Sequence, residues 1–316
     1  MNTGNSILQI KTPRPLDGLT TSIGNTPLLP IKRIARAFLP DVRVAAKAEW
    51  FNPSGSIKDR PAWQIMQDAI AEGLLTEDKR LLDSTSGNMG IAYATFGANL
   101  GVGVTLVIPA NASPERIRVL RALGAEIILS DAAAGADGAV TIARDLARRY
   151  PRRFFYANQY DNPANWRSHY QTTAPEIIAQ TFGQITHFAA GVGTSGTLTG
   201  VARYLRTVDR RIEIIAVQPD RRKHGIDGLK HMPTAIRPAI YDPALPDRIV
   251  RVTTEEARTM TSRLAREEGY FTGISSGANL AAALKVAAGL KRGLVVTVFP
   301  DAGFKYLSGA GLWDGD

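Results

Sequence analysis

Several residue types and patterns are missing from this chain, and each absence removes a class of function. None of the 316 residues is cysteine, which excludes disulfides, thiolate metal sites and cysteine nucleophiles. The segment from Met1 to Pro15 has no apolar core of the secretory-signal kind, and no run approaches the ~20 apolar residues that span a bilayer. The 4 histidines have no metal-ligand spacing. We therefore expect no metal, no membrane association and a cytoplasmic location.

The chain is basic, with a formal net charge of +9 and a pI near 9.8. Its basic residues are scattered and their densest runs are short, which favours solvated arginines over a nucleic-acid surface. A positive field of this kind also attracts anionic substrates and phosphorylated cofactors. We therefore expect small-molecule partners and no nucleic acid.

Short apolar runs alternate with amphipathic segments along most of the chain, which predicts an α/β architecture with parallel sheets covered by helices on both faces. The length exceeds that of one usual hydrophobic core, so we expect one large unit or two packed domains. Segment 220–247 is rich in Pro, Gly and charge without a period, and it is predicted to be a substrate-facing loop. Strands are expected at 42–49, 80–83, 104–109, 125–130, 186–190, 212–218 and 294–300, and helices at 61–72, 90–100, 114–123 and 137–149.

A Pro/Gly turn at 52–61 follows an expected strand, precedes an expected helix and presents a single lysine, Lys58. A lone lysine in such a turn is most often simply solvated. Burial near the strand ends would instead lower its pKa and let it form a Schiff base. Lys58 is therefore a candidate cofactor lysine, provided that the fold buries it.

A cluster of small residues at 85–90 opens the next expected helix. Free N–H groups at a helix start bind anions such as a carboxylate, and Asn88 can donate a side-chain hydrogen bond. A plain N-cap at Ser86 explains the same residues, and this segment alone favours that interpretation.

Glycines and hydroxyl residues at 191–197 follow an apolar run that ends at Ala190. Such a loop forms a nest for a phosphate. Gly191, Gly193 and Gly196 also fit the dinucleotide fingerprint G-x-G-x-x-G, whose acidic partner could only be Asp220, beyond a proline. The hydroxyls suit a bare phosphate better, and both interpretations stay open at this point.

Two later segments add candidate ligand contacts. Residues 273–278 open an alanine-rich helix, where Ser275 is either part of an N-capped start or a neutral hydroxyl that faces a pyridine nitrogen. Residues 301–306 follow a strand end, which is where α/β sheets bind their ligands.

In this order and spacing, the five motifs resemble those of the cysteine synthase and cystathionine β-synthase family of fold-type II pyridoxal-phosphate enzymes, and most of all the cysteine synthase B type. The resemblance runs from Ile23 to Ser308. It implies two three-layer α/β domains with mainly parallel twisted sheets, and a homodimer. An N-terminal domain of residues 1–18 and 45–162 would bind substrate, and a C-terminal domain of residues 19–44 and 163–316 would bind the cofactor phosphate.

The family also implies a role for each motif. Lys58 would hold pyridoxal 5′-phosphate and move the Cα proton, Asn88 would contact the cofactor's 3′ oxygen, and Ser275 would hydrogen-bond the pyridine nitrogen. The cofactor phosphate would be held by Gly193, Thr194, Ser195, Gly196 and Thr197. The substrate carboxylate would be bound by Thr85, Ser86, Gly87, Met89 and Gln159.

The implied reaction is a β-replacement on an activated L-serine. O-acetylserine or O-phosphoserine loses its β-substituent to give an aminoacrylate, and sulfide or thiosulfate adds to it on the way to L-cysteine. A neutral serine partner leaves the pyridine nitrogen unprotonated, which favours loss of the leaving group over transamination. Arg221, Arg222 or Lys223 is either a contact for a phosphate or part of an exposed basic turn.

One residue departs from the family pattern, because Met89 stands where threonine is usual. Methionine cannot donate a hydroxyl to the carboxylate, and one such hydrogen bond contributes roughly 1.5–3 kcal/mol. Either the backbone suffices or another amino acid is the substrate. The alternatives are a cystathionine β-synthase, a 2,3-diaminopropionate synthase, a serine/threonine dehydratase, a nicotinamide-dependent dehydrogenase and a non-catalytic binding protein.

Overall fold

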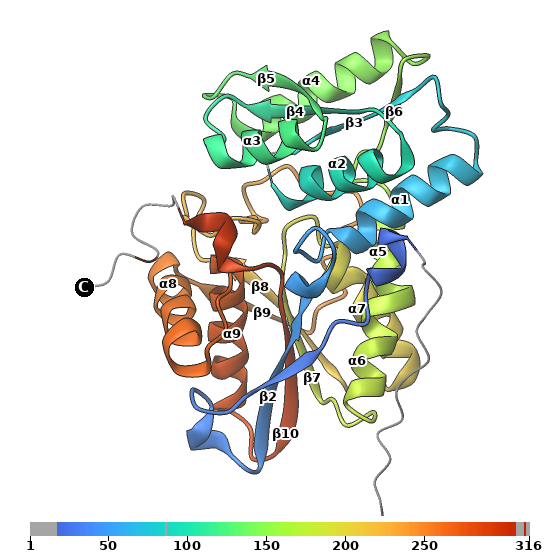
Figure 1. Ribbon diagram of the computed structural model, residues 1–316. Helices are drawn as coiled ribbons and strands as arrows, with labels where there is room; N and C mark the ends of the chain where they lie inside the picture. The colour runs from blue at the N-terminus through green and yellow to red at the C-terminus, as the bar shows by residue number, and fades with distance from the viewer. Residues whose placement is uncertain (1–17, 86, 308–312, 314–316) are drawn as a thin grey trace, which may run out of the picture.

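The computed structural model describes residues 18–85, 87–307 and 313 (Figure 1). Strands β1 to β10 span Leu28–Ile31, Val42–Ala48, Arg80–Ser84, Val104–Pro109, Glu126–Ser130, Phe154–Tyr156, His187–Gly191, Glu213–Pro219, Arg248–Val252 and Gly293–Phe299. Helices α1 to α9 span Asp59–Ala71, Asn88–Leu100, Pro114–Ala122, Gly135–Arg149, Ala164–Ser168, Ala174–Gln180, Gly196–Val208, Thr254–Arg263 and Ile274–Ala287. Short 3₁₀ turns lie at Leu19–Ser22, Arg36–Phe38, Glu49–Phe51 (η3) and Gly303–Tyr306 (η6), and π-helical turns at His169–Thr173 and Leu264–Glu268.

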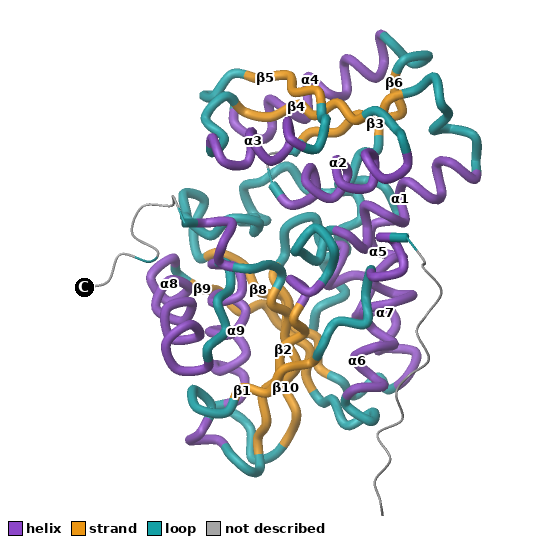
Figure 2. Tube along the Cα trace, in the orientation of Figure 1, coloured by secondary structure: helices purple, strands orange, loops and turns teal. Residues whose placement is uncertain are grey.

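The strands form two sheets that occupy separate halves of the molecule (Figure 2). The smaller sheet has the order β5-β4-β3-β6, and its neighbouring strands are all parallel. The larger sheet has the order β1-β2-β10-β7-β8-β9, and within it β1 pairs antiparallel with β2 while the other pairs are parallel. The predicted α/β architecture with mainly parallel sheets is confirmed.

The smaller sheet is buried on both faces. Successive strand residues point to opposite sides, and helices pack against each side. Leu81 of β3 packs with Ile65 of α1 and Phe96 of α2. The next residue, Leu82, packs instead with Ala143 of α4 on the other face. Helices therefore cover both faces, and this domain has three layers (Figure 1).

The larger sheet repeats this arrangement. Ile214 of β8 packs with Val201 of α7, whereas its neighbour Ile215 packs with Ala282 of α9. Both domains are therefore three-layered, as predicted. The longest described helix, α4, has 15 residues, and no helix in the described part of the chain is long and apolar enough to cross a membrane.

One predicted domain boundary is wrong. The limit between residues 44 and 45 falls inside β2, whose pairing with β10 runs without a break from Val42 opposite Gly293 to Ala48 opposite Phe299. Residues 45–48 therefore belong to the larger sheet, since a strand cannot be divided between two sheets. The limit at 162–163 falls between β6 and α5 and stays a prediction, while residues 1–17 lie outside the described part.

Candidate active site

A cavity of about 320 Å³ lies between the two domains, within the usual range of roughly 300–1,000 Å³ for small-molecule sites. Residues at or just after the carboxyl ends of four parallel strands line it: Thr85 after β3, Pro109 in β4, Gly191 in β7 and Pro300 after β10. Ligands bind at this edge in parallel α/β sheets. Here two such edges face each other across one cavity.

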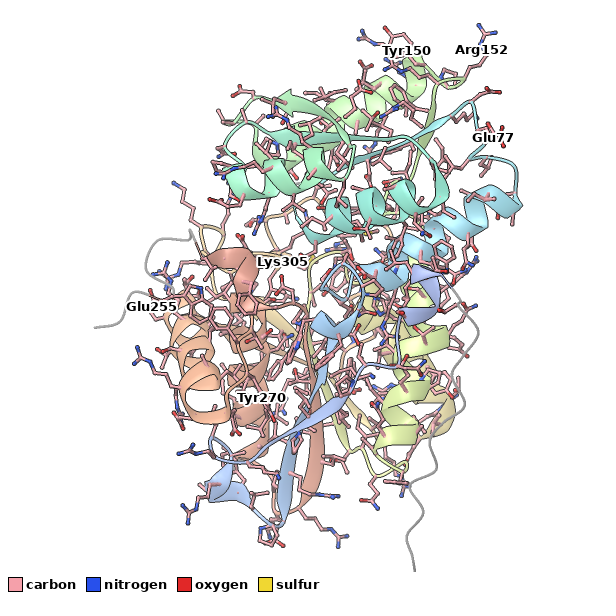
Figure 3. All side chains as sticks on the ribbon, viewed as in Figure 1. Glu77, Tyr150, Arg152, Glu255, Tyr270 and Lys305 are labelled. Atoms are coloured by element: carbon pink, nitrogen blue, oxygen red, sulfur yellow. The ribbon has the colours of Figure 1, made fainter. Side chains whose placement is uncertain are left out.

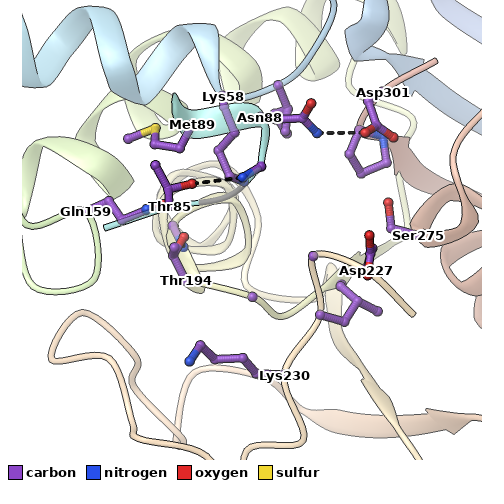
Figure 4. Close-up of a pocket in the computed structure, with 18 of the residues that line it drawn as sticks. Lys58, Thr85, Asn88, Met89, Gln159, Thr194, Asp227, Lys230, Ser275 and Asp301 are labelled. Carbon is purple, nitrogen blue, oxygen red and sulfur yellow. Dashed lines mark hydrogen bonds between the residues drawn. The ribbon is translucent and has the colours of Figure 1, made fainter. Parts of the chain in front are cut away.

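All predicted site residues in the described part of the chain line this cavity, and Ser86 lies outside the described residues (Figure 4). The fold thus brings together motifs that are far apart in the sequence. The residues concerned are Lys58, Thr85, Gly87, Asn88, Met89, Gln159, Gly193, Thr194, Ser195, Gly196, Thr197 and Ser275.

The turn that carries Lys58 is fixed against the end of β10. The backbone N–H of Ile57 donates to the carbonyl of Pro300 at 2.8 Å, and Ser56 forms a β-bridge with Asp301. The backbone N–H of Ser54 donates to the Asp59 carboxylate at 2.6 Å, which closes the turn at the start of α1. The predicted strand–turn–helix setting of Lys58 is therefore present.

The Lys58 side chain is half-buried, and its amine has no hydrogen-bond or ion-pair partner among the described residues. Desolvation by burial lowers the pKa of Lys58, and the charges of Asp301 and Glu49 oppose this only in part. A lowered pKa increases the share of neutral amine, which is the form that attacks a carbonyl carbon. The chemistry of this lysine fits a Schiff-base role.

Two residues after Lys58, a buried ion cluster holds the start of α1. The guanidinium of Arg60 donates to Glu49 at 2.8 Å and to Glu176 at 2.7 Å, and Lys47 pairs with Glu176 at 2.5 Å. Glu49 is fully buried, and the positive charge of Arg60 keeps its pKa low in spite of burial. Removing one member of a buried pair would leave the other charge unpaired, so this cluster anchors the start of α1, directly after Lys58.

Asn88 is held by two charged residues from the far end of the chain. Its Nδ2 donates to Asp301 Oδ2 at 2.6 Å, and its Oδ1 accepts from Lys305 Nζ at 2.8 Å. The hydroxyl of Tyr306 also donates to Asp301 Oδ2, at 2.6 Å. Lys305 lies where the two domains meet (Figure 3), so the loop after β10 sets the orientation of an amide at the start of α2.

The glycine-rich loop fits a phosphate. A methyl group added at Gly193 would lie 2.2 Å from the carbonyl oxygen of Gly228, and one at Gly196 would lie 1.9 Å from Asn165 Oδ1. Both positions therefore exclude any larger residue. The loop leads directly into α7, a helix of 13 residues, and free N–H groups at a helix start attract phosphate. Ser195, at the N-cap, has a φ of 74°, which turns the backbone into the helix.

Ser275 lies in the first turn of α9, is 5% exposed and faces the same cavity. A neutral hydroxyl here can contact a pyridine nitrogen. Together with Lys58 and the loop that suits a phosphate, it completes a set of groups that fits the cofactor predicted from the sequence.

The end of the cavity predicted to bind a carboxylate is arranged around the start of α2. Met89 is 1% exposed and packs into the apolar core beside α1, so it offers no polar group to the site. Gln159 is nearly buried, and its Nε2 donates to the carbonyl of Ser84 at 3.3 Å. Thr85 Oγ1 accepts from the N–H of Gly87 at 3.2 Å. Among the described residues, Thr85, Gln159 and backbone groups are therefore polar groups available there.

Several lining residues were not predicted individually, among them Arg116, Tyr160, Asp227, Lys230 and Asn279. Single residues inside a helix or a loop carry no local motif. Asp227 and Lys230 do come from segment 220–247, so this segment lines the cavity, and its predicted role as a substrate-facing loop stays a prediction.

The basic turn next to this segment does not reach the cavity. Arg221 pairs with Asp220 at 2.9 Å and its side chain is 62% exposed, while Arg222 and Lys223 are exposed as well. The half-buried Lys230 is the basic residue of the segment that lines the cavity.

Comparisons with known proteins agree with this geometry. A family model described as pyridoxal-phosphate dependent enzyme matches residues 19–301. A cysteine synthase from Aquifex aeolicus is 46% identical over 299 residues, which cover 93% of this chain and 91% of that protein. Cysteine synthase B from Escherichia coli is 39% identical over 292 residues, or 92% and 94% of the two chains.

A solved cysteine synthase from Entamoeba histolytica superposes with a TM-score of 0.91 at 33% identity, covering 98% of this chain and 94% of that one. The family match includes both Lys58 and the glycine-rich loop, which decides against the dinucleotide interpretation. The chain therefore belongs to the pyridoxal-phosphate-dependent enzyme family, as the sequence motifs predicted, and pyridoxal phosphate is its cofactor.

Proposed function

We propose that this enzyme forms L-cysteine by replacing the β-substituent of an activated L-serine with a sulfur nucleophile. The observation that carries the proposal is the unpaired amine of Lys58, which faces the same cavity as Asn88, Ser275 and the start of α7. Relatives named cysteine synthase, at 39% to 46% identity over nearly the whole chain, support the same reaction.

The contacts suggest a separate role for each group of residues in the site. When bound, the cofactor acts as an electron sink for negative charge at the substrate Cα. The neutral amine of Lys58 takes the Cα proton, and the loop at 193–197 holds the phosphate against the start of α7. The amide of Asn88 is fixed by Asp301 and Lys305, so its second N–H can serve the 3′ oxygen.

The substrate carboxylate is proposed to bind to Thr85, Gln159 and the backbone of 86–89. Because the Met89 side chain packs into the core, it does not replace the threonine hydroxyl that the family resemblance leads us to expect here. The backbone N–H groups at the start of α2 remain as donors, and anions bind well at such a helix start. We therefore keep a serine ester as the substrate.

Lys230 bears on which ester and which sulfur source the enzyme prefers. Its ammonium lies 4.8 Å from the centre of the Tyr160 ring, and no carboxylate pairs with it among the described residues. Burial lowers the pKa of Lys230, and Asp137 partly opposes this. Lys230 lies across the opening from Lys58 (Figure 4). An unpaired cation at this place favours anionic partners such as a phosphate ester, hydrosulfide or thiosulfate.

An absorption spectrum with product analysis tests the proposal. The purified holoenzyme should be yellow, and a Lys58→Ala variant should lose the lysine-bound band. Addition of O-acetylserine or O-phosphoserine should shift that band, and later addition of sulfide or thiosulfate should restore it with release of L-cysteine or S-sulfocysteine. Lys291→Ala, an exposed lysine outside the cavity, is the matched control and should behave as wild type.

Other outcomes would replace this proposal. Pyruvate and ammonia as the sole products would make the protein a dehydratase. A thioether or diamino acid formed only with homocysteine or an amine would make it a cystathionine β-synthase or a 2,3-diaminopropionate synthase. We also propose a homodimer, which rests on the family resemblance, and a cytoplasmic location, as expected from the sequence. Sedimentation equilibrium checks the homodimer, and cell fractionation checks the location.

A further inference from the structure

Arg116 is a cationic residue of the cavity wall that none of the predicted motifs includes. It lies in the first turn of α3, in the domain of the smaller sheet. Its Nη2 donates to Asp227 Oδ2 at 2.9 Å, and Asp227 belongs to the segment between β8 and β9 of the larger sheet. The two side chains therefore form an ion pair between the domains, and both residues line the cavity (Figure 4).

The guanidinium of Arg116 keeps most of its hydrogen-bonding capacity for a ligand. A guanidinium carries five N–H donors. Within the described part of the chain, this side chain has one hydrogen-bond acceptor, a single oxygen of Asp227. The centre of the Tyr306 ring lies 5.4 Å from the guanidinium carbon, and contact with a ring face leaves in-plane N–H groups free. The Arg116 side chain is 21% exposed, so a small ligand can reach it.

Asp227 is a partner that another anion can displace. Its side chain is 56% exposed, and it holds Arg116 through one oxygen. Ion pairs of this exposure contribute little, because water screens both charges. A ligand that offers two oxygens to the same guanidinium binds it more strongly than one oxygen does.

The charges around this pair favour negatively charged ligands. Lys230, three residues after Asp227, also lines the cavity, and no carboxylate pairs with it among the described residues. Asp301, the other carboxylate among the described lining residues, already accepts two hydrogen bonds. An anion that enters the cavity therefore meets two cations, and of these only Arg116 has a carboxylate to give up.

We propose that Arg116 is a specificity-determining residue, which binds a tetrahedral oxyanion in place of Asp227. The planar fork of a guanidinium matches two oxygens of such a group. The inference rests on the proposed function, in which the oxyanion is either the phosphate of O-phosphoserine or the sulfur donor thiosulfate. Asp227 competes with this ligand, so it weakens the binding of anions and has little effect on the uncharged ester group of O-acetylserine.

Binding of thiosulfate and of inorganic phosphate to the holoenzyme tests this without turnover, since no serine ester is present. In isothermal titration calorimetry, Arg116→Gln should weaken binding about tenfold to a hundredfold, because hydrogen bonds to a charged group are lost. Asp227→Asn should tighten binding about twofold to fivefold, because it removes the competing charge and keeps the size. The double variant should match Arg116→Gln, since Asp227 acts only through Arg116. Arg118→Gln, exposed on the same helix and outside the cavity, is the matched control and should bind as wild type does.

Steady-state kinetics distinguish the two sources of the anion. With sulfide as the sulfur donor, a fall in kcat/KM for O-phosphoserine in Arg116→Gln and a rise in Asp227→Asn would place the leaving group at Arg116. With O-acetylserine as the ester, the same opposite changes in kcat/KM for thiosulfate would place the sulfur donor there. The values for O-acetylserine with sulfide should stay close to wild type in both variants.

Changes of the same sign in Arg116→Gln and Asp227→Asn would overturn the inference, because an ion pair that only holds the domains together is lost equally in both. Unchanged anion binding in both variants would overturn it as well. Asp227→Asn keeps the test decisive if Arg116→Gln does not fold, since it alters only the more exposed partner. Wild-type formation of cysteine and S-sulfocysteine is assayed separately. Opposite shifts in anion binding without either product would reject the proposed reaction and leave this inference standing.

Discussion

Asn88 and Asp301 lie 213 positions apart in the chain, yet Asn88 Nδ2 donates to Asp301 Oδ2 at 2.6 Å. The carboxyl is 1% exposed, and burial raises the pKa of Asp301 while its hydrogen bonds with Tyr306 and Asn88 oppose the rise. Lys305 holds the other end of the amide. The loop after β10 therefore determines the orientation of the Asn88 amide, which is proposed to contact the cofactor.

Removal of this anchor should slow the reaction without releasing the cofactor. We expect Asp301→Ala to lower kcat about tenfold, since one hydrogen bond of this kind contributes roughly 1.5 kcal/mol, and to shift the visible absorption band. Asp301→Asn keeps an acceptor and should recover part of the loss. Wild-type kcat and an unshifted band in Asp301→Ala would show that Asn88 needs no support.

The glycine at 193 gives a prediction about stability and about how much cofactor the enzyme retains. Gly193→Ala places a methyl group 2.2 Å from the carbonyl oxygen of Gly228, and overpacking of this kind costs roughly 1–3 kcal/mol. The variant should melt at a lower temperature and retain less cofactor after dialysis. Gly289→Ala, where the nearest atom is 3.5 Å away, is the control and should match wild type in both measurements.

Lys230 should discriminate between the two serine esters. In Lys230→Gln, kcat/KM for O-phosphoserine should fall about tenfold to a hundredfold, because one hydrogen bond to a charged group is lost. The value for the uncharged ester of O-acetylserine should change much less. An equal decrease in kcat/KM for both esters would mean that Lys230 maintains the shape of the loop and does not contact the phosphate of the substrate. Arg222→Gln, in the exposed turn, should leave both values unchanged.

The sequence alone predicts elements whose periodicity is strong. The strand expected at 104–109 agrees with β4 at both ends. The helix expected at 61–72 begins two residues earlier, at Asp59, because the first turn of a helix tolerates a proline such as Pro61. Short or polar elements were missed. β1 contains Pro30, which an edge strand accepts, and α8 buries only Ala257 and Thr261.

The same distinction applies to the candidate site, where some residues belong to local sequence motifs and others do not. Glycines, hydroxyls and the lysine turn form local motifs, so the order of residues along the chain is enough to propose which of them face the cofactor. Asp301 and Lys305 fell within a predicted ligand loop, but their hydrogen bonds to Asn88 depend on how the two domains meet. Arg116 has no local motif, since only the packing of the two domains brings it beside Asp227.

A buried histidine beside the phosphate loop gives a prediction about pH. His169 is 1% exposed, with ring nitrogens 2.9 Å from Thr173 Oγ1 and 3.3 Å from Thr197 Oγ1. Desolvation first, and then the charges of Arg60 and Lys58, hold the pKa of His169 well below 6.5, against the weaker effect of Glu176.

As pH falls through about 6.5, the unfolded chain binds a proton at His169 that the native state does not, so the free energy of unfolding decreases. This contribution to stability is complete above pH 6.5 and is lost below it, at about 1.4 kcal/mol per pH unit. Denaturant unfolding of wild type and His169→Gln at pH 7.5 and 5.5 measures it. The wild type should lose more stability between the two pH values than the variant, whose glutamine cannot titrate. Equal losses would mean that His169 takes up its proton in the folded protein, and that the loop at 193–197 gains a positive neighbour in acid.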